Sequence, residues 1–165
     1  MAREDFRLLH TERVRWGEAD MQGVVFNAHY LTYIDVGVTE YFRALNEAAG
    51  GSGEGFDGNL PVGGGDFFLA RTELDYHAPA EFDDLLEIGL RISRFGRTSV
   101  EWVGEIHRGG DHLMTARMVY VHADVETKSS KPLPDAFKQV VAAFERVAPE
   151  GAEGGPSGPP AETRP

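Results

Sequence analysis

Hydrophobic side chains recur at every second position in four successive segments between residues 68 and 124. The most regular segment contains Leu86, Ile88, Leu90 and Ile92. The other three segments run from Phe68 to Tyr76, from Val100 to Ile106, and from Met114 to Tyr120. A period of two is typical of strands that bury one face. Short turn signals such as Arg108-Gly109-Gly110-Asp111 lie between the segments, so we expect the strands to form an antiparallel meander.

A different periodicity precedes these strands. From about Asn27 to Glu47, apolar residues recur at helical spacing, namely Tyr30, Ile34, Val38, Tyr41 and Leu45. Leu31, Tyr33 and Phe42 extend the apolar surface beyond one stripe, so this helix needs to be enclosed on several sides. A first strand over residues 6–16 and a short amphipathic helix after Pro134 complete the pattern. We therefore expect an α+β fold in which an antiparallel five-stranded sheet wraps around a long central helix.

The chain of 165 residues is long enough for one sizeable core. We expect a single domain over residues 1–146. Residues 147–165 contain nine Gly or Pro residues and few apolar side chains, so we expect them to form a disordered tail. A second glycine-rich stretch, from Gly50 to Gly65, is expected to be a long surface loop, either a binding loop or an insertion without a role.

Charge and cysteine content narrow the range of partners. The formal net charge of −11 disfavours nucleic acid and anionic membranes. Cysteine is absent, which excludes disulfides and a thiol nucleophile. There is no signal-peptide pattern and no apolar run of membrane-spanning length, so we expect a cytoplasmic protein. An anionic ligand would require a local concentration of positive charge, and Arg94 and Arg97, near the end of a predicted strand, are candidates.

One segment between the first strand and the long helix suggests chemistry. Asp20 and Gly23 lie in this turn, and Asn27, a favoured cap residue, is expected to begin the helix. Unpaired N–H groups at a helix start can stabilise an oxyanion, and a nearby carboxylate can act as a base or nucleophile. The same Asp20 is also consistent with a turn residue whose side chain only binds nearby backbone.

The segment from Asp20 to Tyr30, which reads DMQGVVFNAHY, resembles the signature of the 4-hydroxybenzoyl-CoA thioesterase-like branch of hotdog-fold thioesterases. The match continues over VTEYFRAL at residues 38–45, and the order of the predicted strands is similar from about residue 8 to residue 146. The resemblance implies an acyl-CoA thioesterase that releases a free acid and CoA, with CoA as part of the substrate and no separate cofactor. It also implies a homo-oligomer, a dimer or a homotetramer, with active sites between subunits.

The resemblance also implies roles for individual residues. Asp20 would be the nucleophile or the general base for water, and backbone N–H groups near Gly23 and Asn27 would polarise the thioester carbonyl. The residues expected to bind the substrate are Phe26, His29, Tyr30, Arg94 and Arg97. Some relatives carry His and Asn at the positions of Asn27 and His29, so here these two residues are expected to position water or the acyl group.

Other interpretations stay open beside this one. A binding module that holds acyl-CoA without turnover, and a thioesterase acting on acyl carrier protein, are both compatible with the fold. The acidic surface disfavours an acidic carrier protein. We predict no metal site, because no two histidines show the helical i, i+4 spacing and the histidines are dispersed over the predicted strands. Glu40, on the helix, is expected to be structural. The sequence does not indicate which acyl group is bound.

Overall fold

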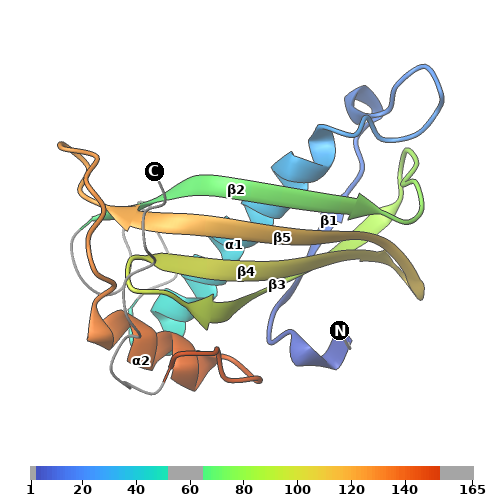
Figure 1. Cartoon of the computed structure of the whole chain (residues 1–165). Helices are drawn as coiled ribbons and strands as arrows, with labels where there is room; N and C mark the ends of the chain where they lie inside the picture. The colour runs from blue at the N-terminus through green and yellow to red at the C-terminus, as the bar shows by residue number, and fades with distance from the viewer. Residues whose placement is uncertain (1–2, 52–64, 153–165) are drawn as a thin grey trace.

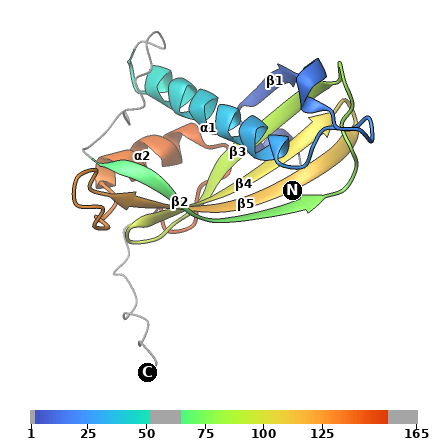
Figure 2. The ribbon, with the colours of Figure 1, turned by 90° about the horizontal axis from the view of Figure 1, so that it is seen from above.

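The computed structural model describes residues 3–51 and 65–152 and contains one five-stranded antiparallel sheet with helix α1 packed on one face (Figures 1 and 2). The strands lie in the order β1-β3-β4-β5-β2. Their bounds are Leu9–Arg13 for β1, Asp66–Tyr76 for β2, Leu85–Phe95 for β3, Ser99–Arg108 for β4 and Asp111–Ala123 for β5. The predicted hotdog arrangement is confirmed. None of the helices in this part of the chain is long and apolar enough to cross a membrane.

Helix α1, His29–Ala48, lies across the sheet as the multi-sided apolar pattern predicts. Its inward residues are almost fully buried, namely Tyr30, Tyr33, Ile34, Val38, Tyr41, Phe42 and Leu45. Gly37 lets the helix approach β3 closely, because an added Cβ would lie 2.8 Å from the side chains of both Ile88 and Leu90. Glu40 pairs with Arg43 one turn later, as expected of a structural residue.

The predicted alternation holds in β3, β4 and β5, where Ile88, Trp102 and Met114 face the helix and are at most 1% exposed. In β2 the alternation is interrupted by an irregularity between Leu69 and Arg71. This bulge reverses the side-chain parity, so Phe67 stacks on Phe42 of α1, whereas the predicted core residue Phe68 is 36% exposed.

Strand β1 is shorter than predicted. It ends at Arg13, and a short 3-10 turn over Trp16–Glu18 follows. Phe6 and Val14 are buried as expected, but Trp16 is 79% exposed and rests only its ring edge against Phe82. The predicted strand over residues 6–16 is therefore too long at its end, and Trp16 does not join the core, because the chain turns away from the sheet before reaching it.

Helix α2, Asp135–Phe144, follows Pro134 and covers one end of the core with Phe137, Val141 and Phe144. The chain beyond α2 then forms two backbone hydrogen bonds with the end of β3, between Glu150 and residues Ser93 and Phe95. Residues 147–152 are therefore part of the folded domain, and the predicted tail does not start at residue 147. The rest of that tail, 153–165, and most of the predicted glycine-rich loop, 52–64, lie outside the described residues.

A carboxylate is buried where this C-terminal segment meets the core. Oε1 of Glu145 accepts hydrogen bonds from the Tyr41 hydroxyl at 2.6 Å and from the Ile92 N–H at 2.7 Å. Its Oε2 is buried and has no hydrogen-bond partner among residues 3–51 and 65–152. Burial raises the pKa of Glu145 above the usual 4.5, although these hydrogen bonds and the charge of Arg91 act in the opposite direction.

Glu145 therefore predicts a specific pH dependence of stability. A raised folded-state pKa favours the fold below the unfolded-state value near 4.5, and this contribution is lost as the pH rises through the folded-state value. We expect the unfolding free energy of the wild type to fall relative to that of Glu145→Gln over the pH range that begins near 4.5 and extends upward. Urea unfolding of both proteins over this range measures the difference. If the unfolding free energy of the wild type instead rose relative to that of Glu145→Gln as the pH increased, the fold would stabilise the charged form of the carboxylate.

Candidate functional site

Asp20 lies in a tight turn that returns the chain from the 3-10 turn at Trp16–Glu18 toward α1. The Asp20 N–H donates to the Val24 carbonyl at 2.9 Å, and the Gly23 N–H donates to the Asp20 carbonyl at 3.0 Å. Gly23 has a φ of +81°, which explains the glycine in the motif, because other residues rarely adopt this conformation. In the structure, Gly23 therefore has a conformational role. Its N–H already donates a hydrogen bond within the turn, so it is not available to polarise a thioester carbonyl.

The Asp20 side chain is partly buried and has two distinct oxygens. Oδ1 accepts the Gln22 N–H at 2.7 Å, so Asp20 does have the local turn role that the sequence allowed. Among the hydrogen bonds of residues 3–51 and 65–152, none involves Oδ2. One carboxylate oxygen is therefore held in place by the turn, while the other has no competing partner.

The helix start differs from the prediction in one respect. The N-cap of α1 is Ala28, not Asn27, and no side chain caps the helix. Asn27 lies one residue earlier and is exposed. Its carbonyl accepts the Tyr76 hydroxyl at 3.0 Å. Its N–H donates no hydrogen bond within the described part of the chain, so it is the more suitable of the two predicted backbone donors for an oxyanion.

A pocket of about 290 Å³ opens beside this helix start. It is lined by Val25, Asn27, Tyr30, Tyr76, His77, Ala78 and Pro79. Two of the predicted site residues, Asn27 and Tyr30, therefore belong to its wall. Asp20, Gly23, Phe26 and His29 belong to the adjoining turn and first helical turn but do not line the pocket in this single chain.

Hydrogen bonds fix the aromatic wall of this pocket. The Tyr30 hydroxyl accepts the buried Ala80 N–H at 2.9 Å, and the Tyr30 and Tyr76 rings meet edge to face with centroids 5.3 Å apart. Burial raises the pKa of both tyrosines, so their hydroxyls stay protonated at neutral pH. The wall therefore offers apolar surface and neutral hydroxyls, which suit an uncharged acyl chain.

The turn that carries Asp20 is anchored to α1 through Glu18. Its carboxylate accepts the Tyr33 hydroxyl at 2.6 Å. Burial acts to raise the pKa of Glu18, but the hydrogen bonds from Tyr33 and Arg15 outweigh it and hold the pKa below its usual range. The backbone continues this anchoring, because the Phe26 N–H donates to the Glu18 carbonyl at 2.9 Å.

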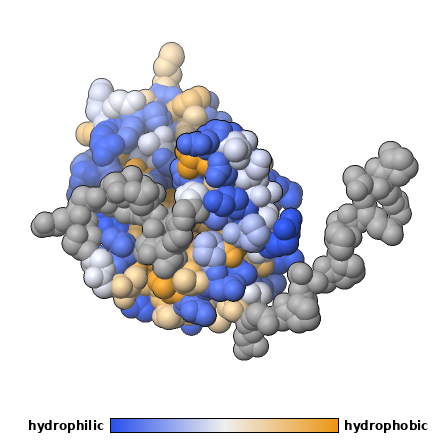
Figure 3. All heavy atoms as spheres, turned by 90° about the vertical axis from the view of Figure 1, so that its left-hand side faces the viewer, coloured by the Kyte–Doolittle hydropathy of each residue, from blue (hydrophilic) through white to orange (hydrophobic). Residues whose placement is uncertain are grey.

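Arg94 and Arg97 are not brought to the pocket. Strand pairing places Tyr76, at the pocket, level with Ile88 of β3, and Arg94 lies six residues further along. Six strand residues span roughly 20 Å. Arg94 is also paired with Glu101 at 2.9 Å. Figure 3 views the molecule from the left-hand side of Figure 1, the end that carries the turn between β3 and β4, where hydrophilic and hydrophobic residues are interspersed. Within one chain, these arginines do not belong to the same site as Asp20.

Tyr76 and His77 are pocket residues that the sequence analysis did not identify. In the sequence, Tyr76 is the last residue of an alternating segment, and His77 is one of several histidines dispersed over the predicted strands. Both residues directly precede the Ala78-Pro79 step, which ends β2 opposite the start of the helix. This strand-ending proline is the sequence signal that could have identified them.

Comparison with known proteins adds an independent line of evidence. Residues 22–115 match the family model described as the thioesterase superfamily. The chain is 29% identical over 136 residues to an acyl-CoA thioesterase YbgC of Haemophilus influenzae, covering 82% of this chain and 92% of that protein.

Two solved structures share the fold. A Thermus thermophilus thioesterase complexed with coenzyme A and Zn is 26% identical with a TM-score of 0.70, and it covers 86% of this chain and 96% of its own. The PA5185 protein of Pseudomonas aeruginosa is 23% identical with a TM-score of 0.71, covering 88% and 96%.

Proposed function

This chain belongs to the thioesterase superfamily, and we propose from this premise that it hydrolyses an acyl-CoA to a free acid and CoA. The observation that supports the proposal most directly is the position of the pocket. An apolar, aromatic pocket opens at the start of α1, and the turn that presents Asp20 adjoins it. The acyl-CoA thioesterase activity named for the Haemophilus influenzae relative supports the same substrate class.

In the proposed reaction, the thioester carbonyl lies beside the Asn27 N–H, which stabilises the negative charge that develops on the oxygen. Oδ2 of Asp20 accepts a proton from water as the water oxygen bonds to the carbonyl carbon. The carbon–sulfur bond then breaks, and the proton passes to the CoA thiolate. Direct attack by Asp20, followed by hydrolysis of the resulting anhydride, gives the same products. In both routes Asp20 is the catalytic carboxylate.

In this proposal Phe26 and His29, which lie beside the pocket at the helix start, contact the substrate together with Tyr30 of the pocket wall. The Phe26 and His29 rings meet edge to face with centroids 6.1 Å apart. Phe26 is 49% exposed in the single chain, which leaves it accessible to an acyl group or to a second subunit.

We further propose that the protein is a homo-oligomer whose subunits meet along β2. This strand is at the edge of the sheet, and its side chains Phe68, Leu69 and Tyr76 are 36%, 50% and 48% exposed. A long edge strand with exposed apolar side chains is normally covered, because it also exposes unpaired backbone groups. Sedimentation equilibrium is expected to give twice or four times the chain mass of 18.1 kDa, and a concentration-independent monomer would contradict the proposal.

The activity itself is tested by thiol release from short, medium, long and aromatic acyl-CoAs. We expect turnover that depends strongly on the acyl group, because the pocket wall is apolar and about 290 Å³ in volume. Acyl-CoA binding without thiol release, measured with the folded protein, would favour a binding module instead. If only acyl carrier protein thioesters were hydrolysed, the protein would be an acyl-carrier-protein thioesterase.

A further inference from the structure

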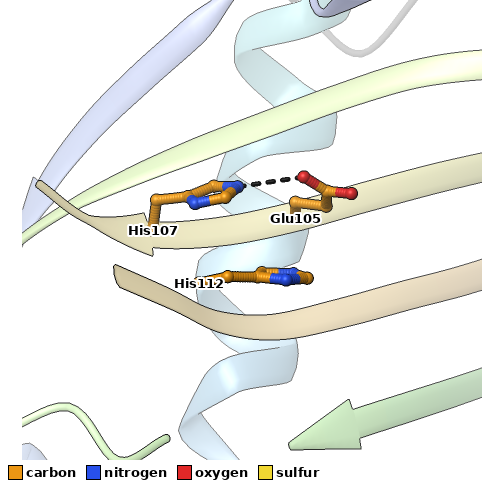
Figure 4. A group of neighbouring side chains, drawn as sticks. All are labelled: Glu105, His107 and His112. Carbon is orange, nitrogen blue, oxygen red and sulfur yellow. Dashed lines mark hydrogen bonds and ion pairs between the residues drawn. The ribbon is translucent and has the colours of Figure 1, made fainter. Parts of the chain in front are cut away.

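A cluster of two histidines and one glutamate lies at the tip of the β4–β5 hairpin, on the sheet face opposite α1. Glu105 and His107 come from β4, and His112 comes from β5 (Figure 4). His107 and His112 are direct partners across the hairpin. The register shifts by one residue beside this pair, which places both rings on the same face as Glu105. Residues that are separate in the sequence thus converge on one point.

The distances within the cluster are short. One ligand atom from each of the three residues lies within 4.8 Å of the other two. Nε2 of His107 is 2.9 Å from Oε2 of Glu105, and the two imidazole rings stack with centroids 4.8 Å apart. Tetrahedral zinc ligands at about 2.1 Å from the metal are about 3.4 Å apart. The three groups therefore lie near the spacing of a tetrahedral site, and binding an ion requires small side-chain adjustments.

The burial of this cluster favours the binding of a cation. Glu105 is only 3% exposed and the His107 side chain 11%, so water screens this carboxylate poorly. Of the arginines near the hairpin, Arg3 pairs with Glu87 and Arg108 pairs with Asp84 at 2.7 Å. His112 is the most accessible of the three and gives an ion a route in from solvent.

The His112 ring is also supported by neighbours outside the cluster. Its Nε2 lies 3.1 Å from the Met114 carbonyl and 3.1 Å from the Thr115 hydroxyl. The same hydroxyl lies 3.0 Å from Nε2 of His77, a residue of the pocket wall. Such outer contacts orient the histidine ligands of metal sites. They also connect this cluster to the loop that closes the pocket.

We propose that Glu105, His107 and His112 bind a divalent transition-metal ion, with Zn²⁺ as the best match to two imidazoles and one carboxylate. The fourth position is taken by water, since the hairpin tip borders solvent. The bound ion joins β4 to β5 at the tip of their hairpin and, through Thr115 and His77, stiffens the adjoining pocket wall. This role is structural and does not depend on the proposed hydrolysis.

The test is metal titration of the full, metal-stripped chain. Zn²⁺ is expected to bind at one ion per chain by calorimetry and, at about 100 times its Kd, to raise the melting temperature by about 5–10 °C. Co²⁺ in place of Zn²⁺ is expected to give the visible absorption of a four- or five-coordinate site. This spectrum reports the ligand set without any assay of activity.

Variants identify the ligands. His112→Gln, at the exposed edge of the cluster, and Glu105→Gln, at its buried side, are each expected to weaken binding at least 10-fold and to remove the Co²⁺ bands. His10→Gln is the matched control, because His10 also lies beside a carboxylate, 3.5 Å from Glu12, but on β1. Should Zn²⁺ fail to bind below about 1 mM, or bind equally to all three variants, the proposed site would be overturned.

Discussion

Replacement of Asp20 by asparagine is expected to lower kcat for acyl-CoA hydrolysis by about 100-fold or more, the scale of losing a general base or a nucleophile. The turn geometry makes this substitution informative. The asparagine carbonyl can still accept the Gln22 N–H that now bonds to Oδ1, so the turn is expected to survive. The lost group is the second carboxylate oxygen, which takes the proton or attacks the carbonyl. KM and the melting temperature are therefore expected to change little, and thiol release with the preferred acyl-CoA measures the effect.

Asp135→Asn provides the control for Asp20→Asn. Asp135 is also an aspartate at the start of a helix, but it lies in the first turn of α2 and pairs there with Lys138 at 3.5 Å. It has no contact with the pocket beside α1, so its replacement is expected to leave kcat within a factor of two. Equal activity of Asp20→Asn and the wild type would remove Asp20 from the mechanism and leave water activation to another group.

The fold followed from the sequence because its periodicities were long and consistent. Ile88, Trp102 and Met114 were predicted to face the helix and are buried against it. The predictions were wrong where a local irregularity changed the pattern. The bulge in β2 replaced Phe68 by Phe67 in the core. The early end of β1 left Trp16 exposed.

The candidate site could be predicted only in part, because its residues meet through tertiary structure. Asp20, Asn27 and Tyr30 were found together since they belong to one continuous segment. His77 reaches the pocket from the end of β2, and its local signal is limited to the strand-ending Ala78-Pro79 step that follows it. For His107 and His112, a signal did exist: they flank the predicted hairpin turn at Arg108–Asp111, and antiparallel pairing places such residues opposite each other.

The second large expected effect is a loss of stability when Trp102, a core residue packed against α1, is replaced. Its side chain is 1% exposed and lies against the helix, with ring centroids 4.7 Å from Tyr41 and 5.5 Å from Phe42. Removing a buried tryptophan loses its apolar transfer energy and leaves a cavity. We expect Trp102→Ala to lower the free energy of unfolding by about 3–5 kcal/mol. This is a large fraction of the roughly 5–15 kcal/mol that stabilises a typical domain.

The exposed tryptophan Trp16 is the internal control for this prediction. Its only described ring contact is with Phe82, at a centroid distance of 5.1 Å, so Trp16→Ala is expected to cost about 1 kcal/mol or less. Urea unfolding followed by far-UV circular dichroism compares both variants with the wild type without relying on tryptophan fluorescence. A similar loss from the two substitutions would contradict the packing of α1 on β4. A large loss from Trp102→Ala alone would support the packing of α1, the helix that carries the pocket wall, on β4.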